Sequence, residues 1–255
     1  LVLFDDALKH MIKINRLMEM PRGSGLLVGV GGSGKQSLTR LSSYISRFMC
    51  FQITLTKTYN QASLLEDIRT LYRNAGAGKG TTFLFTESEI KAESFLETLN
   101  SVLMTGEVPG LFAKDEIMAM TAELRPSFIK NRPGVEETQD NLKAYLTDVT
   151  RDNLHLMLCM SPLNPKFPER ARRFPGLVSA PTIDWFLPWP EEALVAVSKG
   201  FLGKFEMACD DDIKGNMMTT MGMCHAHTTD VCLEYFEKMR RQVYQTPKSY
   251  LSFIA

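Results

Sequence analysis

A stretch of nine residues, Gly29 to Ser37, has the composition and spacing of a phosphate-binding loop. The pattern G-x-x-x-x-G-K runs from Gly29 to Lys35 and lies between an apolar run and a helical pattern. Glycines let consecutive backbone N–H groups point at one anion, the following helix offers its positive end, and Lys35 adds a cation. We therefore predict that ATP or ADP is bound by Gly29, Val30, Gly31, Gly32, Ser33, Gly34, Lys35, Gln36 and Ser37.

The metal side of this predicted site departs from the usual pattern. Gln36 stands where such loops place a Ser or Thr hydroxyl for Mg²⁺, and Thr86 stands where a carboxylate is usual. If Mg²⁺ is bound, Gln36 and Thr86 are its predicted ligands. Glu87 is the predicted residue for polarising the attacking water. Because each lost stabiliser costs on the order of 100- to 1,000-fold in rate, we expect nucleotide binding with weak or no hydrolysis.

The elements that must position these residues alternate between strands and helices. Helical faces follow one another at Leu38–Phe48, Leu64–Tyr72, Phe95–Leu103 and Leu142–Val149, the third with a capping-box start at Ser94. Strand patterns occur before, between and after these faces, at Gly25–Val30, Phe51–Leu55, Thr81–Phe85 and Leu154–Met160. This alternation predicts an α/β fold in which helices cover a parallel sheet. The sequence contains no apolar run long enough for a transmembrane span.

The pattern changes after Trp189. Pro190 followed by two glutamates is a typical helix start. Further apolar positions, from Val231 to Val243, indicate another helix, and no strand signal of similar strength follows. We expect residues 1–189 to form a large α/β subdomain and residues 190–255 to form a small helical one.

Net charge indicates which partners to expect, and the cysteine spacing indicates the redox state of the thiols. Lys plus Arg and Asp plus Glu both number 29, so the composition indicates no broad electrostatic attraction to nucleic acid or to a membrane. The five cysteines show no framework spacing and are expected to be reduced thiols. The N-terminus, LVLFDDALKH, has neither an initiator Met nor a signal pattern, so we expect a piece of a longer polypeptide.

Several separate blocks resemble one family. GVGGSGKQSLTRL, FLFTESEIKAESFLETLNSVLMTGEVPGLF, LHLMLCMSP, FPGLVSAPTIDWFLPWP and TPKSYLSFI together look like the fourth AAA+ module of a dynein heavy chain. Gln36 and IDWFLPWP look more like the axonemal than the cytoplasmic branch. The resemblance implies a P-loop AAA+ large subdomain and a helical lid that ends just before the stalk coiled coil of a microtubule motor.

The resemblance also assigns roles to single residues. Glu87 matches the hydrolytic glutamate, Thr86 the acidic position before it, and Ser161 a sensor position. No arginine stands near Ala180, where a finger for the neighbouring module would lie, and Arg170, Arg172 and Arg173 are the partial substitutes upstream. No sensor arginine can be placed in the lid. The N-terminal run Leu1 to Phe4 resembles the segment that lies against adenine, which implies Leu1 and Val2 as nucleotide-binding residues.

The implied partners are neighbouring AAA+ modules of the same chain, a microtubule reached through the stalk outside this chain, and dynein intermediate and light chains. Neither nucleic acid nor a membrane is an expected partner. The implied location is the cytoskeleton of a ciliary or flagellar axoneme. Three readings stay open for the module: a regulatory site that holds ATP or ADP, a working ATPase that uses Glu87, and an empty structural segment of the ring.

Overall fold

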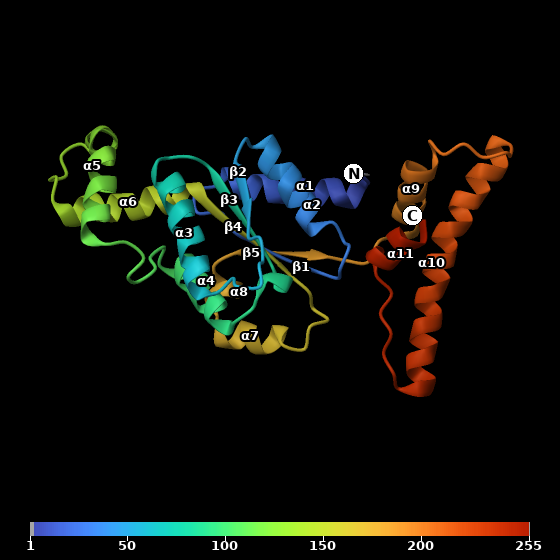
Figure 1. Ribbon diagram of the computed structural model, residues 1–255. Helices are drawn as coiled ribbons and strands as arrows, with labels where there is room; N and C mark the ends of the chain where they lie inside the picture. The colour runs from blue at the N-terminus through green and yellow to red at the C-terminus, as the bar shows by residue number, and fades with distance from the viewer. Residues whose placement is uncertain (1–2, 255) are drawn as a thin grey trace. The chain divides into compact units, whose positions relative to one another are not determined.

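Strands and helices alternate as far as Phe186, and helices follow (Figure 1). The computed structural model of the chain describes residues 3–254. Its strands are β1 Gly25–Gly29, β2 Met49–Gln52, β3 Thr81–Thr86, β4 Leu154–Met160 and β5 Thr182–Phe186. Its helices are α1 Asp5–Glu19, α2 Lys35–Ile45, α3 Gln61–Gly76, the 3₁₀ turn η1 Glu87–Glu89, α4 Glu93–Met104, α5 Lys114–Asn131, α6 Gln139–Asn153, α7 Phe167–Arg173, α8 Gly176–Ser179, α9 Glu191–Leu202, α10 Asp211–Met239 and α11 Pro247–Ile254.

Within residues 3–254 the strands form one five-stranded sheet in the order β2-β3-β4-β1-β5. The pairs β2–β3, β3–β4 and β4–β1 are parallel. Cys159 of β4 lies opposite Leu27 of β1 and opposite Thr86 of β3. The carboxyl ends of these three strands therefore reach the same edge of the sheet, and the α/β fold predicted from the alternation is confirmed.

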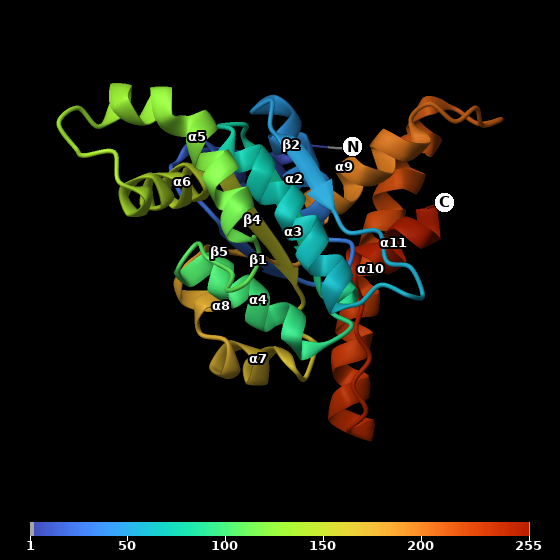
Figure 2. The same cartoon turned by 60° about the vertical axis from the view of Figure 1, so that its left-hand side comes forward.

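Helices cover both faces of this sheet. On one face, Phe83 and Phe85 of β3 pack with residues of α3 and α4, such as Leu64 and Phe95, in the largest apolar cluster. The opposite face carries Thr82, whose hydroxyl lies 3.9 Å from the sulfur of Met18 in α1. In Figure 2, α3 and α4 lie on the side of the sheet toward the viewer. Period-two side-chain alternation thus separates the two helical layers.

Two boundaries predicted from the sequence are wrong. The predicted strand at Phe51–Leu55 is β2, Met49–Gln52, since β2 pairs with β3 from Met49↔Thr81 onward and the chain leaves the sheet after Gln52. The predicted cap Ser94 lies inside α4, which has Ala92 as its N-cap. The Ser94 hydroxyl instead donates to the Gln61 side chain at 2.8 Å, so a tertiary contact takes the group that a cap would use.

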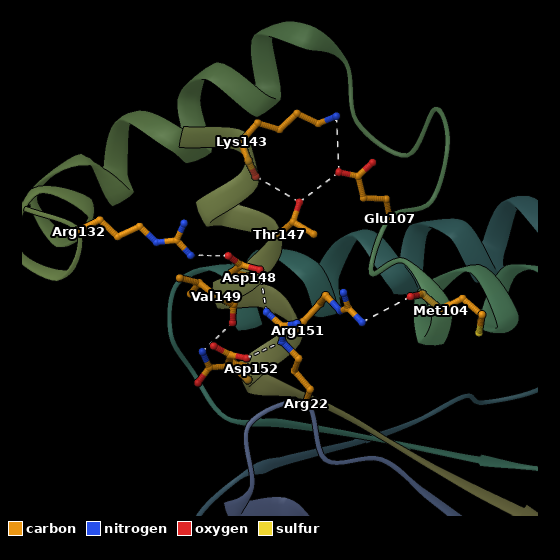
Figure 3. A network of polar contacts seen from close by, with 11 residues as sticks. Arg22, Met104, Glu107, Arg132, Lys143, Thr147, Asp148, Val149, Arg151 and Asp152 are labelled. Atoms are coloured by element: carbon orange, nitrogen blue, oxygen red, sulfur yellow. Dashed lines mark hydrogen bonds and ion pairs between the residues drawn. The ribbon is translucent and has the colours of Figure 1, made fainter. Parts of the chain in front are cut away.

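Ion pairs connect the helices α5 and α6 to each other and to the turn after α1 (Figure 3). Arg22, in the turn after α1, donates to Asp148 at 2.8 Å and to Asp152 at 3.2 Å. Arg132, at the end of α5, donates to the second oxygen of Asp148 at 2.6 Å. Asp148 therefore joins three segments that are distant in sequence. Figure 3 also draws Glu107 with Lys143 and Thr147, and Arg151 with the Met104 carbonyl.

The chain divides into two compact units. One holds residues 10–28 and 36–184, which include most of the sheet. Of the described residues, the other holds 3–9, 29–35 and 185–254. In that second unit, Leu194, Val197, Tyr250 and Ile254 form a buried cluster among α9 and α11. A subdomain boundary after Trp189 stays a prediction.

No helix within residues 3–254 combines the length and the apolar character needed to cross a membrane.

His155 of β4 gives the fold a pH dependence. Its side chain is 1% exposed, and its Nδ1 donates to the Gly23 carbonyl at 2.7 Å. Burial lowers the pKa of the imidazole below its ordinary value of 6.5, so the folded ring stays neutral while the unfolded ring gains a proton. As the pH falls below about 6.5, the free energy of unfolding should fall by up to about 1.4 kcal/mol per pH unit.

Denaturant titrations of the wild type and of His155→Gln, between about pH 7 and pH 5, measure this effect. The variant keeps a hydrogen-bond donor but has no group that titrates in this range. Its pH slope should be flatter than that of the wild type, and equal slopes in the two proteins would contradict the prediction.

Candidate functional site

The predicted phosphate loop has the backbone that an anion cradle needs. β1 ends at Gly29 and α2 begins at Lys35, so the loop leads from a strand into a helix N-terminus as the sequence predicts. Gly32 and Gly34 have φ values of 83° and 94°, a region that residues with a Cβ atom rarely adopt. Alternating backbone signs of this kind turn successive N–H groups toward one side of the loop.

Lys35 folds back over this loop. Its Nζ donates to the carbonyls of Gly29 at 2.6 Å and Val30 at 2.8 Å, and to the Ser33 hydroxyl at 3.1 Å. The ammonium group therefore lies among loop atoms, at the position from which it can exchange carbonyl partners for phosphate oxygens.

The helix α11 lies directly against the loop, within the same compact unit. A Cβ atom added to Gly32 would lie 2.4 Å from the backbone nitrogen of Lys248, near the start of α11. Lys248 was not placed beside this loop by the sequence analysis, and the packing of its backbone against Gly32 is the contact that sequence reasoning missed. Its signal was the TPKSYLSFI block, in which the lysine follows a proline suited to a helix start.

Leu1 and Val2, predicted to lie against adenine, are outside the described residues. Their neighbour Phe4 is described, and its ring packs edge-on against Trp189 with the centroids 5.4 Å apart. Residues 3–9, the loop and helices α9 to α11 thus belong to one compact unit.

The metal-side residues of the α/β unit suit Mg²⁺ poorly. The side chains of Gln36 and Ser37 are exposed on α2. The Thr86 hydroxyl makes a 2.8 Å hydrogen bond with Ser88. The nearby carboxylate of Glu89 accepts a 2.7 Å hydrogen bond from the Thr86 backbone N–H. No group of three His, Cys, Asp or Glu residues within residues 3–254 could hold a metal ion. A hydroxyl and an amide alone leave Mg²⁺ dependent on phosphate oxygens and water.

Glu89 is a second carboxylate that the sequence did not single out. It is 4% exposed, and its other oxygen accepts a 2.7 Å hydrogen bond from Gln52. Burial raises the pKa of Glu89 above its ordinary value. Thr86 is the N-cap of η1, and Glu89, three residues later, accepts the Thr86 N–H as in a capping box. The spacing Thr86-x-x-Glu89 is the sequence signal that could have revealed this role.

Glu87, the predicted hydrolytic glutamate, lies at the end of β3 and is held by the segment after β4. One carboxylate oxygen accepts the backbone N–H of Ser161 at 3.2 Å. The other accepts the side-chain amide of Asn164. The predicted sensor Ser161 therefore contacts Glu87 through its backbone, while its hydroxyl accepts the Leu163 N–H at 3.3 Å. Asn164, which the sequence analysis did not single out, makes the side-chain contact with this carboxylate.

Arg170 is not available as a substitute arginine finger. It is 9% exposed and donates to Glu93 at 2.9 Å and 3.2 Å, and its third nitrogen lies 3.5 Å from Glu87. Arg172 and Arg173, on the same short helix α7, are exposed. The three arginines predicted together therefore separate into one buried residue that faces Glu87 and two exposed ones.

Comparison with known families agrees with this geometry. The family model described as P-loop containing dynein motor region D4 matches residues 1–255. The chain belongs to this family. Among its relatives, axonemal dynein heavy chain 5 of Mus musculus is 51% identical over the whole chain. Axonemal dynein heavy chain 8 of Homo sapiens and the flagellar outer-arm dynein gamma chain of Chlamydomonas reinhardtii are each 49% identical over the whole chain.

The chain spans about 6% of the length of these relatives. It is therefore similar to one motor-region segment of axonemal dynein heavy chains, and the family confirms an AAA+ motor module with a P-loop. The blocks that carried the sequence resemblance all lie within the matched range.

Replacing either of two neighbouring glycines in the Gly29–Lys35 loop by alanine should change the free energy of unfolding by different amounts. Gly32→Ala forces a positive φ on alanine and drives its Cβ toward Lys248, whereas Cβ at Gly31 meets nothing within 4 Å. We expect Gly32→Ala to lower the free energy of unfolding by about 1–2 kcal/mol or more, and Gly31→Ala by less than about 0.5 kcal/mol. Denaturant melts of both variants test this, and similar losses would contradict the loop geometry.

Proposed function

We propose that this chain is a nucleotide-binding AAA+ module of an axonemal dynein heavy chain, which holds ATP or ADP in a regulatory role with weak or no hydrolysis. The observation that supports it most is the loop from Gly29 to Lys35. Its positive-φ glycines, its position between β1 and α2, and its inward-folded lysine together make a site for a polyphosphate.

The residues present fit a nucleoside di- or triphosphate. Backbone N–H groups of the loop would bind the phosphate oxygens, and Lys35 would exchange the Gly29 and Val30 carbonyls for them. Lys248 and the first turn of α11 lie against Gly32 and would feel the added negative charge. A bound phosphate tail would thus stiffen the contact between the loop and the lid, which is the proposed regulatory effect.

The proposed weak hydrolysis is argued from the residues at the positions that usually hold Mg²⁺. Gln36 replaces a hydroxyl ligand and Thr86 replaces a carboxylate, and the Thr86 hydroxyl is engaged with Ser88. Two such losses, each on the order of 100- to 1,000-fold, reduce the rate far more than they reduce binding. Binding depends on the backbone cradle and Lys35, which these substitutions leave unchanged.

One observation favours a second candidate, a working ATPase. Glu87 directly follows β3, and its carboxylate accepts a hydrogen bond from the Asn164 amide, which suits a group that activates water. The third reading, an empty structural segment, gives no reason for a lysine folded over a glycine cradle.

In the intact motor we propose neighbouring AAA+ modules of the same heavy chain as direct partners, with a microtubule reached through the stalk and with intermediate and light chains elsewhere in the complex. The proposed location is the axonemal cytoskeleton of a cilium or flagellum. The names of the relatives, axonemal heavy chains and a flagellar outer-arm chain, support these assignments.

Nucleotide retention by the intact heavy chain tests the proposal. After incubation with millimolar ATP and rapid gel filtration, Lys35→Ala should reduce the nucleotide retained by one equivalent per chain, since it removes the loop's cation. Glu87→Gln should leave retention unchanged. Its motor velocity should stay within about twofold of wild type, because a holding site does not need a base.

Equal slowing of the motor by Lys35→Ala and Glu87→Gln would replace the proposal with the working ATPase. Retention that is the same in wild type and Lys35→Ala would indicate an empty segment instead.

A further inference from the structure

Arg170 connects two carboxylates inside the α/β unit. Its Nε and one terminal nitrogen both donate to Glu93, at 3.2 Å and 2.9 Å. The other terminal nitrogen lies 3.5 Å from Glu87. With 9% of its surface exposed, the guanidinium is nearly removed from water, so its charge must be balanced by these two neighbours.

The groups that hold Glu87 come from one short stretch of chain. Ser161, Asn164 and Arg170 all follow β4, and we call these three residues the Glu87 clamp. The turn between them is fixed locally, since the Asn164 side chain accepts the Lys166 N–H at 2.9 Å and the Asn164 carbonyl accepts the Phe167 N–H at 2.9 Å. A shift of α7 would therefore move Asn164 and Arg170 together.

A general base must turn a carboxylate oxygen toward the water it activates. In this structure the oxygen Oε1 of Glu87 meets both Asn164 and Arg170, while Oε2 accepts the Ser161 N–H. All three groups attract the ionised carboxylate, but only Arg170 brings a full positive charge, 3.5 Å from Oε1, so turning this oxygen away would separate opposite charges in a nearly buried place.

We propose that Arg170 is a positioning residue that restrains Glu87, so that the placement of α7 sets how fast nucleotide is hydrolysed at this site. The inference rests on the proposed function, because it requires a nucleotide on the Gly29–Lys35 loop. It adds a control of hydrolysis that is separate from the metal-side residues Gln36 and Thr86.

Substitution of Glu93 provides a control that distinguishes two possible roles of Arg170. If Arg170 only fastens α7 to α4, Arg170→Gln and Glu93→Gln break the same contact and should act alike. If Arg170 restrains Glu87, the two act differently. Arg170→Gln releases Glu87, whereas Glu93→Gln removes the competing carboxylate and leaves the guanidinium to Glu87.

The experiment uses the intact heavy chain and radiolabelled ATP. The nucleotide retained after rapid gel filtration is measured with and without Lys35→Ala, and the difference is assigned to this module. The conversion of that fraction from ATP to ADP is then followed over time. We expect Arg170→Gln to speed conversion by about tenfold or more with retention unchanged, since general-base groups contribute 100-fold or more. Glu93→Gln should not speed it.

Two further variants secure the interpretation. Adding Glu87→Gln to Arg170→Gln should abolish the gain, because the released base is then absent. Arg170→Lys keeps one ion pair with Glu93 and should also speed conversion, which decides the matter if Arg170→Gln folds poorly.

Unchanged conversion in Arg170→Gln and Arg170→Lys, or equal changes in Arg170→Gln and Glu93→Gln, would overturn the role of Arg170 while the proposed function stands. Retention that does not depend on Lys35 in the wild type would overturn the proposed function, and this inference with it.

Discussion

Parallel pairing of β1, β3 and β4 in a fixed register is the constraint on which the candidate site depends. Because Cys159 lies opposite both Leu27 and Thr86, all three strands end at one edge of the sheet. The glycine loop follows β1 directly, and Glu87 and Ser161 directly follow β3 and β4. A slip of one residue in β4 would exchange its two buried faces, so packing of both helical layers fixes where the chemical groups lie.

The parts that could be predicted from the sequence are those with strong local signals. β1, β3 and β4 are buried along their whole lengths, which produces continuous apolar runs that stand out from the helical patterns. The glycine loop is also recognisable locally, because positive φ at Gly32 and Gly34 requires residues without a Cβ atom. Fold class and phosphate loop therefore follow from short-range chemistry alone.

The parts that could not be predicted depend on contacts between distant residues. β5 inverts the usual pattern, since Trp185 is 54% exposed while Asp184 is 4% exposed. Asp184 tolerates burial because His10 and Lys13 of α1 contact it at 2.6 Å and 2.9 Å. Burial alone would raise the pKa of Asp184, but these partners outweigh it and lower that pKa. The roles of Asn164 and Arg170 likewise arise from a turn after β4 that has no sequence motif.

Binding and hydrolysis are separable in this architecture because they use different atoms. The cradle consists of backbone groups and Lys35, whose geometry is set by glycines and by the junction of β1 with α2. Under the proposed function, hydrolysis would depend on the side chains at positions 36, 86 and 87, and each of these can change without altering the cradle. In the proposed site, substitution at the metal side would lower the hydrolysis rate permanently, whereas the ion pair of Arg170 with Glu87 would lower it reversibly. A module with both features would hydrolyse its bound nucleotide slowly. A movement of α7 would then raise the hydrolysis rate.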